Sequence, residues 1–354
     1  MSNQHNHSHL WPGVPLALSS ALLFGASPPL SKVLLATISP FMLAGLLYLG
    51  AGIGLALYRL LTSAAKTQKN TSGLSRKDWP WLGVAVVMGG IIGPLLLLAG
   101  LRQTDASTGA LLLNVESIAT MAIAWIIFRE NVDRRLLAGA AAILCGALVL
   151  AWDGNGIAIN RGALLVIAAC LAWAIDNNVT RNISASDPTT IAMIKGLVAG
   201  SVNLSIALLT GDSFPTAGLG ISAAIIGFFT VGVSLVLFIL ALRHLGTART
   251  GAYFSLAPFI GAVLSVAFLG DPLTSKLIIA GLLMGIGLWI HLTEHHGHDH
   301  GHDPLEHEHA HVHDVHHQHT HSGPVSEPHA HAHKHSPMNH KHAHYPDLHH
   351  RHDH

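Results

Sequence analysis

The stretch LRQTDASTGALLLNVESIATMAIAWIIFRE (residues 101–130) lines up with a second stretch of the same chain, LRHLGTARTGAYFSLAPFIGAVLSVAFLGD (residues 242–271). Both begin with Leu-Arg and end with an acidic residue. Earlier in each half, LLFGASPPLSK (22–32) lines up with LAWAIDNNVTR (171–181). Self-similarity at long range is typical of a chain built from repeated structural units. The sequence therefore predicts two halves with the same architecture.

The composition indicates a membrane protein. Of the 354 residues, 50% are hydrophobic and only 11% are charged. A transmembrane helix needs about 20 mostly apolar residues. The stretches that meet this requirement are residues 13–35, 40–60, 80–101, 105–128, 135–152, 162–182, 189–210, 219–242, 248–269 and 273–292. Because these spans have almost no amphipathic face, a soluble helical bundle is disfavoured, and we expect an all-α polytopic membrane protein with ten transmembrane helices.

The basic residues predict how the chain is oriented. Short loops on the cytoplasmic side of a membrane carry an excess of Lys and Arg. The connections on one side hold eleven such residues: Arg59, Lys66, Lys69, Arg76, Lys77, Arg129, Arg134, Arg135, Arg181, Arg243 and Arg249. Those on the other side hold four: Lys32, Arg102, Arg161 and Lys276. We therefore expect an inner (plasma) membrane protein with both termini in the cytoplasm.

Each half contains five predicted spans, and this odd number determines how the halves are related. The second half must enter the membrane from the opposite side, which gives the inverted-repeat architecture of secondary transporters, with a site near the midplane between the halves. The predicted organisation is a cytoplasmic N-terminus (1–12), a first five-helix repeat (13–152), a connecting loop (153–161), a second five-helix repeat (162–292) and a histidine-rich tail (293–354).

These features resemble the EamA-type drug/metabolite transporter superfamily. The resemblance rests on the five-span halves, on a fourth span of small residues followed by Phe-Arg-Glu or Leu-Gly-Asp, and on an apolar fifth span, and it covers about residues 13–292. Membership would imply ten helices around a central cavity and, most often, export of small metabolites.

Polar residues inside the spans are the candidates for an intramembrane site. Ionisable groups in hydrocarbon are costly, so each is a functional candidate. The candidates for substrate or ion binding are Glu116, Asp176 and Lys195, together with Asn114, Asn177 and Asn178. Glu116 and Asp176 can bind a cation or take up a proton. Lys195 can instead serve to neutralise a carboxylate, and the asparagines can serve as interhelical hydrogen-bonding groups.

Prolines and glycines inside the spans predict local departures from regular helix. Pro28-Pro29 and Pro94 can kink or break their helices, and such discontinuities recur near transporter sites. Gly50-x-x-x-Gly54 and Gly196-x-x-x-Gly200 permit close helix contact. We expect these glycines to serve internal packing, with a dimer face as the alternative.

The tail alternates histidine with Glu, Asp, Ala and Gly and lacks an apolar period, so we expect it to be disordered. Neutral imidazole is the commonest metal ligand and suits zinc, copper and nickel ions. The candidate metal ligands are His295, His296, His298, His300, His302, His307, His309, His311, His313, His316, His317, His319 and His321. The alternatives without a role in metal handling are a solubilising tail and a functionless low-complexity expansion.

Three functions fit these features. The first is a secondary transporter that exports divalent metal ions, most simply nickel or cobalt and then zinc, with the tail collecting ions at the cytoplasmic mouth. The alternative is an exporter of amino acids or other small metabolites whose tail only binds or senses metal. The third, a membrane-anchored metal buffer, leaves the inverted repeat unexplained. We expect no catalysis, no nucleic-acid partner and no required cofactor, with divalent metal as substrate or tail ligand.

Overall fold

The computed structural model describes residues 12–63, 74–128, 134–152, 160–180, 183, 186–245, 250 and 253–292, and four segments of the tail, 297–302, 306–311, 329–334 and 338–343. The chain divides into two compact units. One holds all the helices. The other holds the four tail strands. The predicted N-terminal segment up to residue 11 and most of the loop 153–161 lie outside the described residues.

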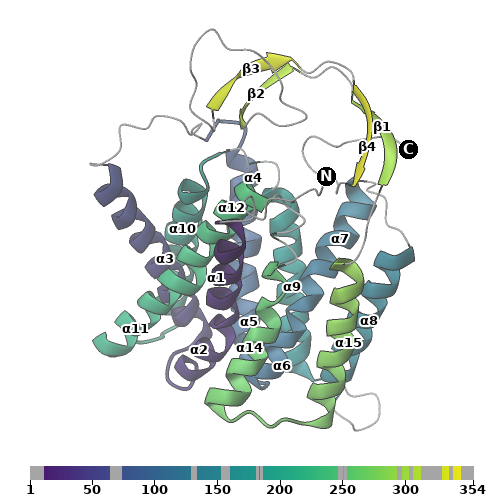
Figure 1. Ribbon diagram of the computed structural model, residues 1–354. Helices are drawn as coiled ribbons and strands as arrows, with labels where there is room; N and C mark the ends of the chain where they lie inside the picture. The colour runs from purple at the N-terminus through teal and green to yellow at the C-terminus, as the bar shows by residue number, and fades with distance from the viewer. Residues whose placement is uncertain are drawn as a thin grey trace. The chain divides into compact units, whose positions relative to one another are not determined.

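The helical unit is built from two successive sets of helices (Figure 1). The first comprises α1 (Gly13–Gly25), α2 (Ser27–Leu34), α3 (Pro40–Ser63), α4 (Trp79–Ala85), the π-helix η2 (Val86–Ile92), α5 (Gly93–Leu101), α6 (Ala106–Leu112), α7 (Asn114–Phe128) and α8 (Arg134–Ala151). The second comprises α9 (Arg161–Thr180), α10 (Pro188–Leu209), α11 (Ala217–Gly227), the π-helix η4 (Phe228–Val233), α12 (Ser234–Leu245), α14 (Ala257–Leu264), the π-helix η5 (Ser265–Leu269) and α15 (Ser275–Leu292).

The expectation of an all-α polytopic membrane fold is confirmed for this unit. Within the described residues, eight helical segments are long and apolar enough to cross a bilayer. The ninth and tenth predicted spans correspond to two shorter apolar helices, Ala257–Leu269 and Ser275–Ile290. Part of the predicted ninth span, at 248–249 and 251–252, lies outside the described residues.

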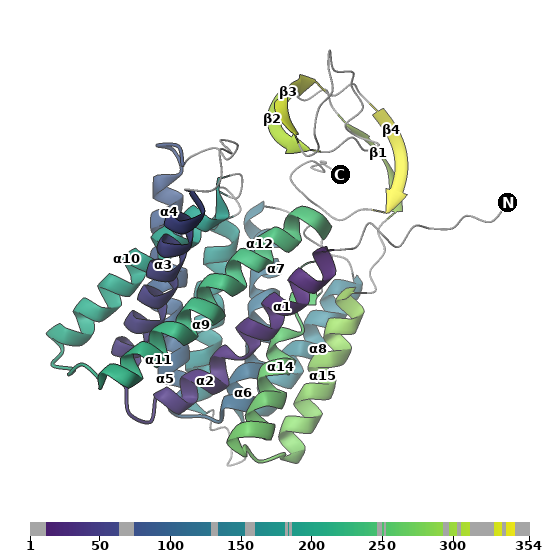
Figure 2. The same cartoon turned by 60° about the vertical axis from the view of Figure 1, so that its left-hand side comes forward.

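Helix packing follows a two-fold pattern between the halves. The second span of one half (α3) packs along the second span of the other (α10), and the two fifth spans, α8 and α15, form a pair of their own. The third span of each half packs against the first span of the other, so that α5 contacts α9 and α12 contacts α1 (Figure 2). The α3–α10 pair is antiparallel, because Gly45 faces Leu204 whereas Gly52 faces Leu197.

Local irregularities repeat in the same way. The third and eighth spans each contain a π-helix, η2 and η4, at matching positions of the aligned halves. The fourth span is interrupted between α6 and α7, and the ninth is interrupted by a turn at residues 255–256, just before α14. Breaks that recur at equivalent positions belong to the architecture of the repeat.

Close contacts of the small residues lie inside the unit. A Cβ atom added at Gly50 would lie 2.1 Å from the carbonyl oxygen of Ala224 in α11, and one added at Gly227 would lie 1.9 Å from that of Leu47 in α3. Gly196 and Gly200 face α3 in the same manner. These glycines let the backbones of neighbouring helices approach closely, which agrees with the internal-packing interpretation.

The four strands of the tail correct the expectation of disorder where they are described. Strand β1 (Gly297–His302) pairs antiparallel with β4 (Met338–Ala343), and β2 (Glu306–His311) pairs antiparallel with β3 (His329–Lys334). The lack of an apolar period excludes a packed core, but the His-x-His alternation has the two-residue period of a strand. Backbone hydrogen bonds join the strands of each ribbon.

Candidate transport site

Two charged residues meet inside the helical unit. The Nζ atom of Lys195 on α10 forms a hydrogen-bonded ion pair with Oδ2 of Asp176 on α9. The side chains are 14% and 7% exposed, respectively. The hydroxyl of Thr180, one turn further along α9, donates to Oδ1 of Asp176 at 3.0 Å. Each oxygen of this carboxylate therefore has a donor, as a buried charge requires.

The start of α10 fixes the position of Lys195. Asp187 precedes the helix, and its carboxylate accepts from the backbone N–H groups of Thr189 and Thr190. Pro188 occupies the first helical turn, where its missing N–H costs nothing. This N-cap fixes the start of α10 about two turns before Lys195. It is reinforced by Arg59 of α3, which pairs with Asp187 at 3.8 Å and thereby connects the two halves.

The π-helix η2 presents two backbone carbonyl groups next to the ion pair. The N–H of Gly93 donates to Met88 instead of Gly89, and Pro94, the usual partner of Gly90 in an α-helix, has no N–H. The carbonyl oxygen of Gly89 instead accepts from the hydroxyl of Tyr48 at 2.8 Å and from Nε1 of Trp173 at 3.0 Å. Pro94 directly follows η2, so a helix irregularity does lie beside the candidate site near this proline.

The adjacent carbonyl is satisfied in the same way. Nδ2 of Asn203 on α10 donates to the carbonyl oxygen of Gly90 at 3.1 Å. Side chains from the second, sixth and seventh spans therefore supply the donors that η2 lacks. Irregular backbone at membrane depth is tolerated where neighbouring helices satisfy its polar groups, and π-helical turns are frequent at functional sites.

Glu116 on α7 contacts α9 at the residue after Asp176. Its Oε1 atom accepts from Nδ2 of Asn177 at 2.8 Å, and the same amide lies 3.4 Å from the hydroxyl of Thr120. Asn177 is exposed and Glu116 is half-buried. Asn177, the hydrogen-bond partner of Glu116, directly follows Asp176 on α9. The three ionisable candidates therefore lie on α7, α9 and α10, with Glu116 and Lys195 contacting neighbouring residues of α9.

The other two asparagines bond to backbone. Nδ2 of Asn178 donates to the carbonyl groups of Ala174, at 2.8 Å, and Thr120, at 3.2 Å, which ties α9 to α7. Nδ2 of Asn114 donates to the carbonyl of Leu111 at 2.8 Å, where α6 ends and α7 begins. These contacts agree with the alternative interpretation, in which both residues hold neighbouring helical segments together by hydrogen bonds.

Sequence reasoning did not select four residues of this cluster. Tyr48, Gly89, Trp173 and Thr180 all contact the ion pair or the η2 carbonyl beside it. In the sequence, a Tyr or Trp inside a span cannot be distinguished from an ordinary apolar residue. The hydrogen bonds of the Tyr48 hydroxyl and of Trp173 Nε1 become visible only when the carbonyl group of Gly89 is located in the structure. The signal that was available is the pair Gly89-Gly90, followed four residues after the second glycine by Pro94.

The candidate metal ligands are only partly described. His298, His300, His302, His307, His309 and His311 lie in β1 and β2, and the other seven lie outside the described residues. Those strands place His307 opposite His333, His309 opposite His331 and His311 opposite His329. Within the part of the chain that the structure describes, no group of three or more His, Cys, Asp or Glu side chains is arranged to hold a metal ion.

Comparison with known proteins identifies relatives of the whole helical unit. The model of the EamA-like transporter family matches residues 11–152 and 160–293. An uncharacterized transporter of Methanothermobacter thermautotrophicus is 30% identical over 301 residues, which cover 79% of this chain and 86% of that protein. A solved crystal structure covers 78% of this chain and 94% of its own with a TM-score of 0.59 at 17% identity, which shows a shared fold.

Two other relatives have names that state a substrate class. A protein of Salmonella typhimurium named as a probable amino-acid metabolite efflux pump is 28% identical over 213 residues, or 53% of this chain and 67% of that protein. A protein of Streptantibioticus cattleyicolor named as a probable terminal-alkyne amino-acid exporter is 24% identical over 228 residues, or 62% of this chain and 76% of that protein.

Proposed function

Because the chain belongs to the EamA-like transporter family and is thus a multi-pass membrane transporter, we propose that it exports amino acids or closely related small metabolites across the plasma membrane. The observation that carries the proposal is the ion pair between Asp176 and Lys195. It places one negative and one positive group side by side, next to the irregular helix η2, where helices of both halves meet.

A zwitterion is chemically matched to such a pair. The α-carboxylate of an amino acid can replace Asp176 as the partner of Lys195, and its α-ammonium can replace Lys195 as the partner of Asp176. A buried charge that loses its partner is strongly destabilised. Exchange of partners therefore keeps every charge paired during binding. After release of the substrate, Asp176 and Lys195 pair again, so the empty site has no net charge.

The same contacts disfavour the metal-export hypothesis. A divalent metal ion needs several unprotonated oxygen, nitrogen or sulfur ligands. One oxygen of Asp176 already accepts from the Lys195 ammonium and the other from Thr180. Asn177 turns its NH₂ group, rather than its oxygen, toward Glu116. A metal ion at this point would have to displace an ammonium group and two further donors, so the geometry favours the amino-acid alternative.

The relatives support the same substrate class. The proteins of Salmonella typhimurium and Streptantibioticus cattleyicolor, whose names refer to amino-acid efflux or export, align with more than half of this chain. Transport by this chain would follow the alternating access of inverted-repeat carriers, in which the halves rock about a site at their interface. From the Lys and Arg distribution we propose that the loading side and both termini are cytoplasmic.

Glu116 is the proposed proton carrier of the exchange. It is hydrogen-bonded to the neutral amide of Asn177, the residue after Asp176, so its carboxylate can change protonation without breaking the ion pair. A transported proton needs a group of this kind inside the membrane. Export would then be coupled to inward movement of protons.

We further propose that the histidine tail binds divalent nickel, cobalt or zinc without being part of the transport path. The register of β2 and β3 brings three pairs of histidines opposite one another. Opposed residues of an antiparallel pair have Cα atoms about 4.5–5.5 Å apart, a separation at which two imidazoles can share one ion.

A flux assay with reconstituted protein tests the amino-acid proposal. The purified full-length chain is placed in proteoliposomes loaded with a mixture of the twenty ¹⁴C-labelled L-amino acids, and in a second set loaded with Ni²⁺, Co²⁺ and Zn²⁺. We expect release of one or more amino acids, stimulated by a proton gradient directed against their flux, and no release of metal above protein-free vesicles. Release of metal without release of any amino acid would refute the proposal.

A further inference from the structure

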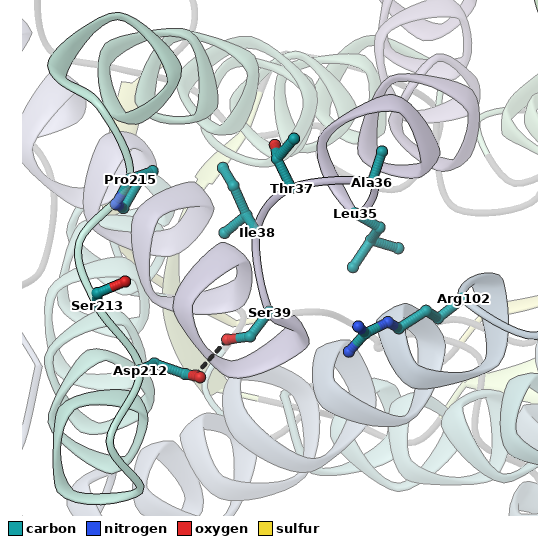
Figure 3. Close-up of a pocket in the computed structure, with 9 residues that line it drawn as sticks. All are labelled: Leu35, Ala36, Thr37, Ile38, Ser39, Arg102, Asp212, Ser213 and Pro215. Atoms are coloured by element: carbon teal, nitrogen blue, oxygen red, sulfur yellow. Dashed lines mark hydrogen bonds between the residues drawn. The ribbon is translucent and has the colours of Figure 1, made fainter.

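A polar cavity lies at the end of the helical unit where the first and second, third and fourth, and seventh and eighth spans are connected. Its volume is about 310 Å³. It is lined by the turn at residues 35–39, by Arg102 at the end of α5, and by Asp212, Ser213 and Pro215 between α10 and α11 (Figure 3). With both termini in the cytoplasm, these connections face the exterior of the cell, so the cavity lies on the exit side.

The end of α10 fixes the position of Asp212. Gly211 adopts a left-handed conformation with φ +90°, which a residue with a side chain rarely tolerates. Its N–H donates to Leu208 and that of Asp212 donates to Ala207. This is the Schellman arrangement, which satisfies the last carbonyl groups of a helix. The residue after the glycine is thereby held in one position at the rim of the cavity.

Ser39 connects Asp212 to the first half. The hydroxyl of Ser39 donates to Oδ2 of Asp212 and also accepts from the N–H of Met42 in the first turn of α3 at 3.2 Å. The carboxylate is half-buried, lines the cavity and points toward Ser39 (Figure 3). The negative charge of Asp212 is therefore positioned by the end of α10 in the second half and by the hydroxyl of Ser39 in the first half.

Arg102 supplies the opposite charge. It immediately follows α5, its side chain is exposed, and its guanidinium group points toward the cavity (Figure 3). Arg102 makes no ion pair with any residue that the structure describes. A guanidinium group binds a carboxylate with two parallel hydrogen bonds, which makes it selective for that group.

From this arrangement we infer that the cavity is a second, exit-side binding site for zwitterionic amino acids. Arg102 receives the α-carboxylate, Asp212 receives the α-ammonium, and the apolar side chains of Leu35, Ile38 and Pro215 border the space left for the substrate side chain. The inference rests on the proposed function, which it deepens. The transported molecule would pass from the Asp176–Lys195 pair to a weaker, more open pair of the same signs before release.

Charge-matched analogues test this site from the outside. Right-side-out membrane vesicles containing the full-length chain are loaded with ¹⁴C-labelled L-amino acids. Efflux is then measured while L-valine, isobutylamine (valine without its carboxylate) or isovalerate (valine without its ammonium) is added outside. For the unchanged protein, external L-valine should inhibit efflux at a concentration at least about tenfold lower than either analogue, since each lost charge contact is worth about 1.4 kcal/mol or more.

Single substitutions identify the two contacts. In Arg102→Gln, valine and isobutylamine should become equally effective inhibitors, and in Asp212→Asn, valine and isovalerate should become equally effective. Arg161→Gln, which removes a positive charge at the same end of the unit but does not line the cavity, should keep the selectivity of the unchanged protein. Loss of discrimination by Arg161→Gln as well would overturn the assignment, because it would indicate a general effect of surface charge.

Two further outcomes separate this inference from the function on which it rests. If the unchanged protein releases no amino acid, the proposed function fails and the exit-side site fails with it. If it releases amino acids but both variants keep the full discrimination between valine and its analogues, only the exit-side site is refuted. Faster efflux in both variants with unchanged selectivity would also refute it and would identify Arg102 and Asp212 as a gate.

Discussion

Gly89 and Asp176 are so close that no side chain fits between them. A Cβ atom added at Gly89 would lie 1.8 Å from Oδ2 of Asp176 and 2.6 Å from Nζ of Lys195. The same glycine carries the carbonyl group that accepts from Tyr48 and Trp173. The ion pair and the π-helix are therefore one packed assembly, and a change in either is transmitted to the other.

The substitution Gly89→Ala should disrupt this assembly. The added methyl group must push Asp176 and Lys195 apart or displace η2, and overpacking of this kind costs about 1–3 kcal/mol. We expect a lower unfolding temperature in detergent and a loss of amino-acid efflux of about tenfold or more.

Gly83→Ala is the matched control. Gly83 lies in α4, within the same predicted span, and a Cβ atom added there would meet nothing within 4 Å beyond the neighbouring backbone of its own helix. Its replacement by alanine should leave efflux unchanged and should keep or slightly raise thermal stability, because alanine favours helix. Equal effects of the two substitutions would show that η2 does not need its close approach to the ion pair.

The ion pair itself can be tested by a double-mutant cycle. Removing one partner leaves the other charge buried and unpaired, which costs about 3 kcal/mol or more. Asp176→Leu and Lys195→Met should therefore each lower the free energy of unfolding, whereas the double variant should recover most of the loss. Thermal unfolding monitored by gel filtration in detergent measures the stability.

Efflux distinguishes a purely structural ion pair from a functional one. A structural pair predicts that the double variant recovers transport together with stability. The proposed exchange of partners requires both charges, so the double variant should be stable but inactive. A stable double variant with normal efflux would place the substrate site elsewhere.

The overall fold was predictable because the features that determine it, apolar stretches and an internal repeat, extend over most of the chain. Long apolar stretches dictate spans, and the match of residues 101–130 with 242–271 dictates two related halves. The two shorter helices, α14 with η5 and α15, still belong to the predicted set, although their length alone does not qualify them as spans. The tail strands were missed because only hydrophobic alternation was treated as a strand signal.

The site was predictable in its charged residues but not in its geometry. The cost of an ionisable group in hydrocarbon marks Glu116, Asp176 and Lys195 wherever they lie. Which carboxylate pairs with the lysine depends on how α9 and α10 both pack against η2, and spacing along the chain does not encode it. The role of Tyr48 depends on a single freed carbonyl group in η2, which exists only in the folded chain.

The substitution Glu116→Gln should separate proton coupling from substrate movement. The oxygen of glutamine can still accept from Asn177, so the 2.8 Å contact and the fold should persist. The variant should retain exchange of labelled for unlabelled amino acid across proteoliposomes while losing the stimulation of efflux by a proton gradient. Ser117→Ala, at the neighbouring exposed position, is the control and should keep both activities. Retained gradient stimulation in Glu116→Gln would assign the proton to another group.

Removal of the tail should abolish high-capacity metal binding and leave amino-acid export intact. The tail strands form their own compact unit, so a chain that ends at Thr293 should keep the unfolding temperature of the full protein. Isothermal titration with Ni²⁺, Co²⁺ and Zn²⁺ should show several bound ions for the full-length chain and a loss of most of them after truncation.

Replacement of His307, His309 and His311 by asparagine in the full-length chain tests the ribbon itself. Each replacement removes one member of a cross-strand pair and preserves the chain length, so the number of bound ions should fall while the amino-acid flux stays within about twofold of the unchanged value. A weak, tethered set of ligands raises the local concentration of an ion without delivering that ion to the transport site.

If these replacements or the truncation instead reduced amino-acid efflux only when Ni²⁺ was present, the tail would be a metal-dependent regulator of the carrier. If they abolished a measurable flux of Ni²⁺, the metal would be a substrate, and the preference for amino acids argued from Lys195 would be wrong.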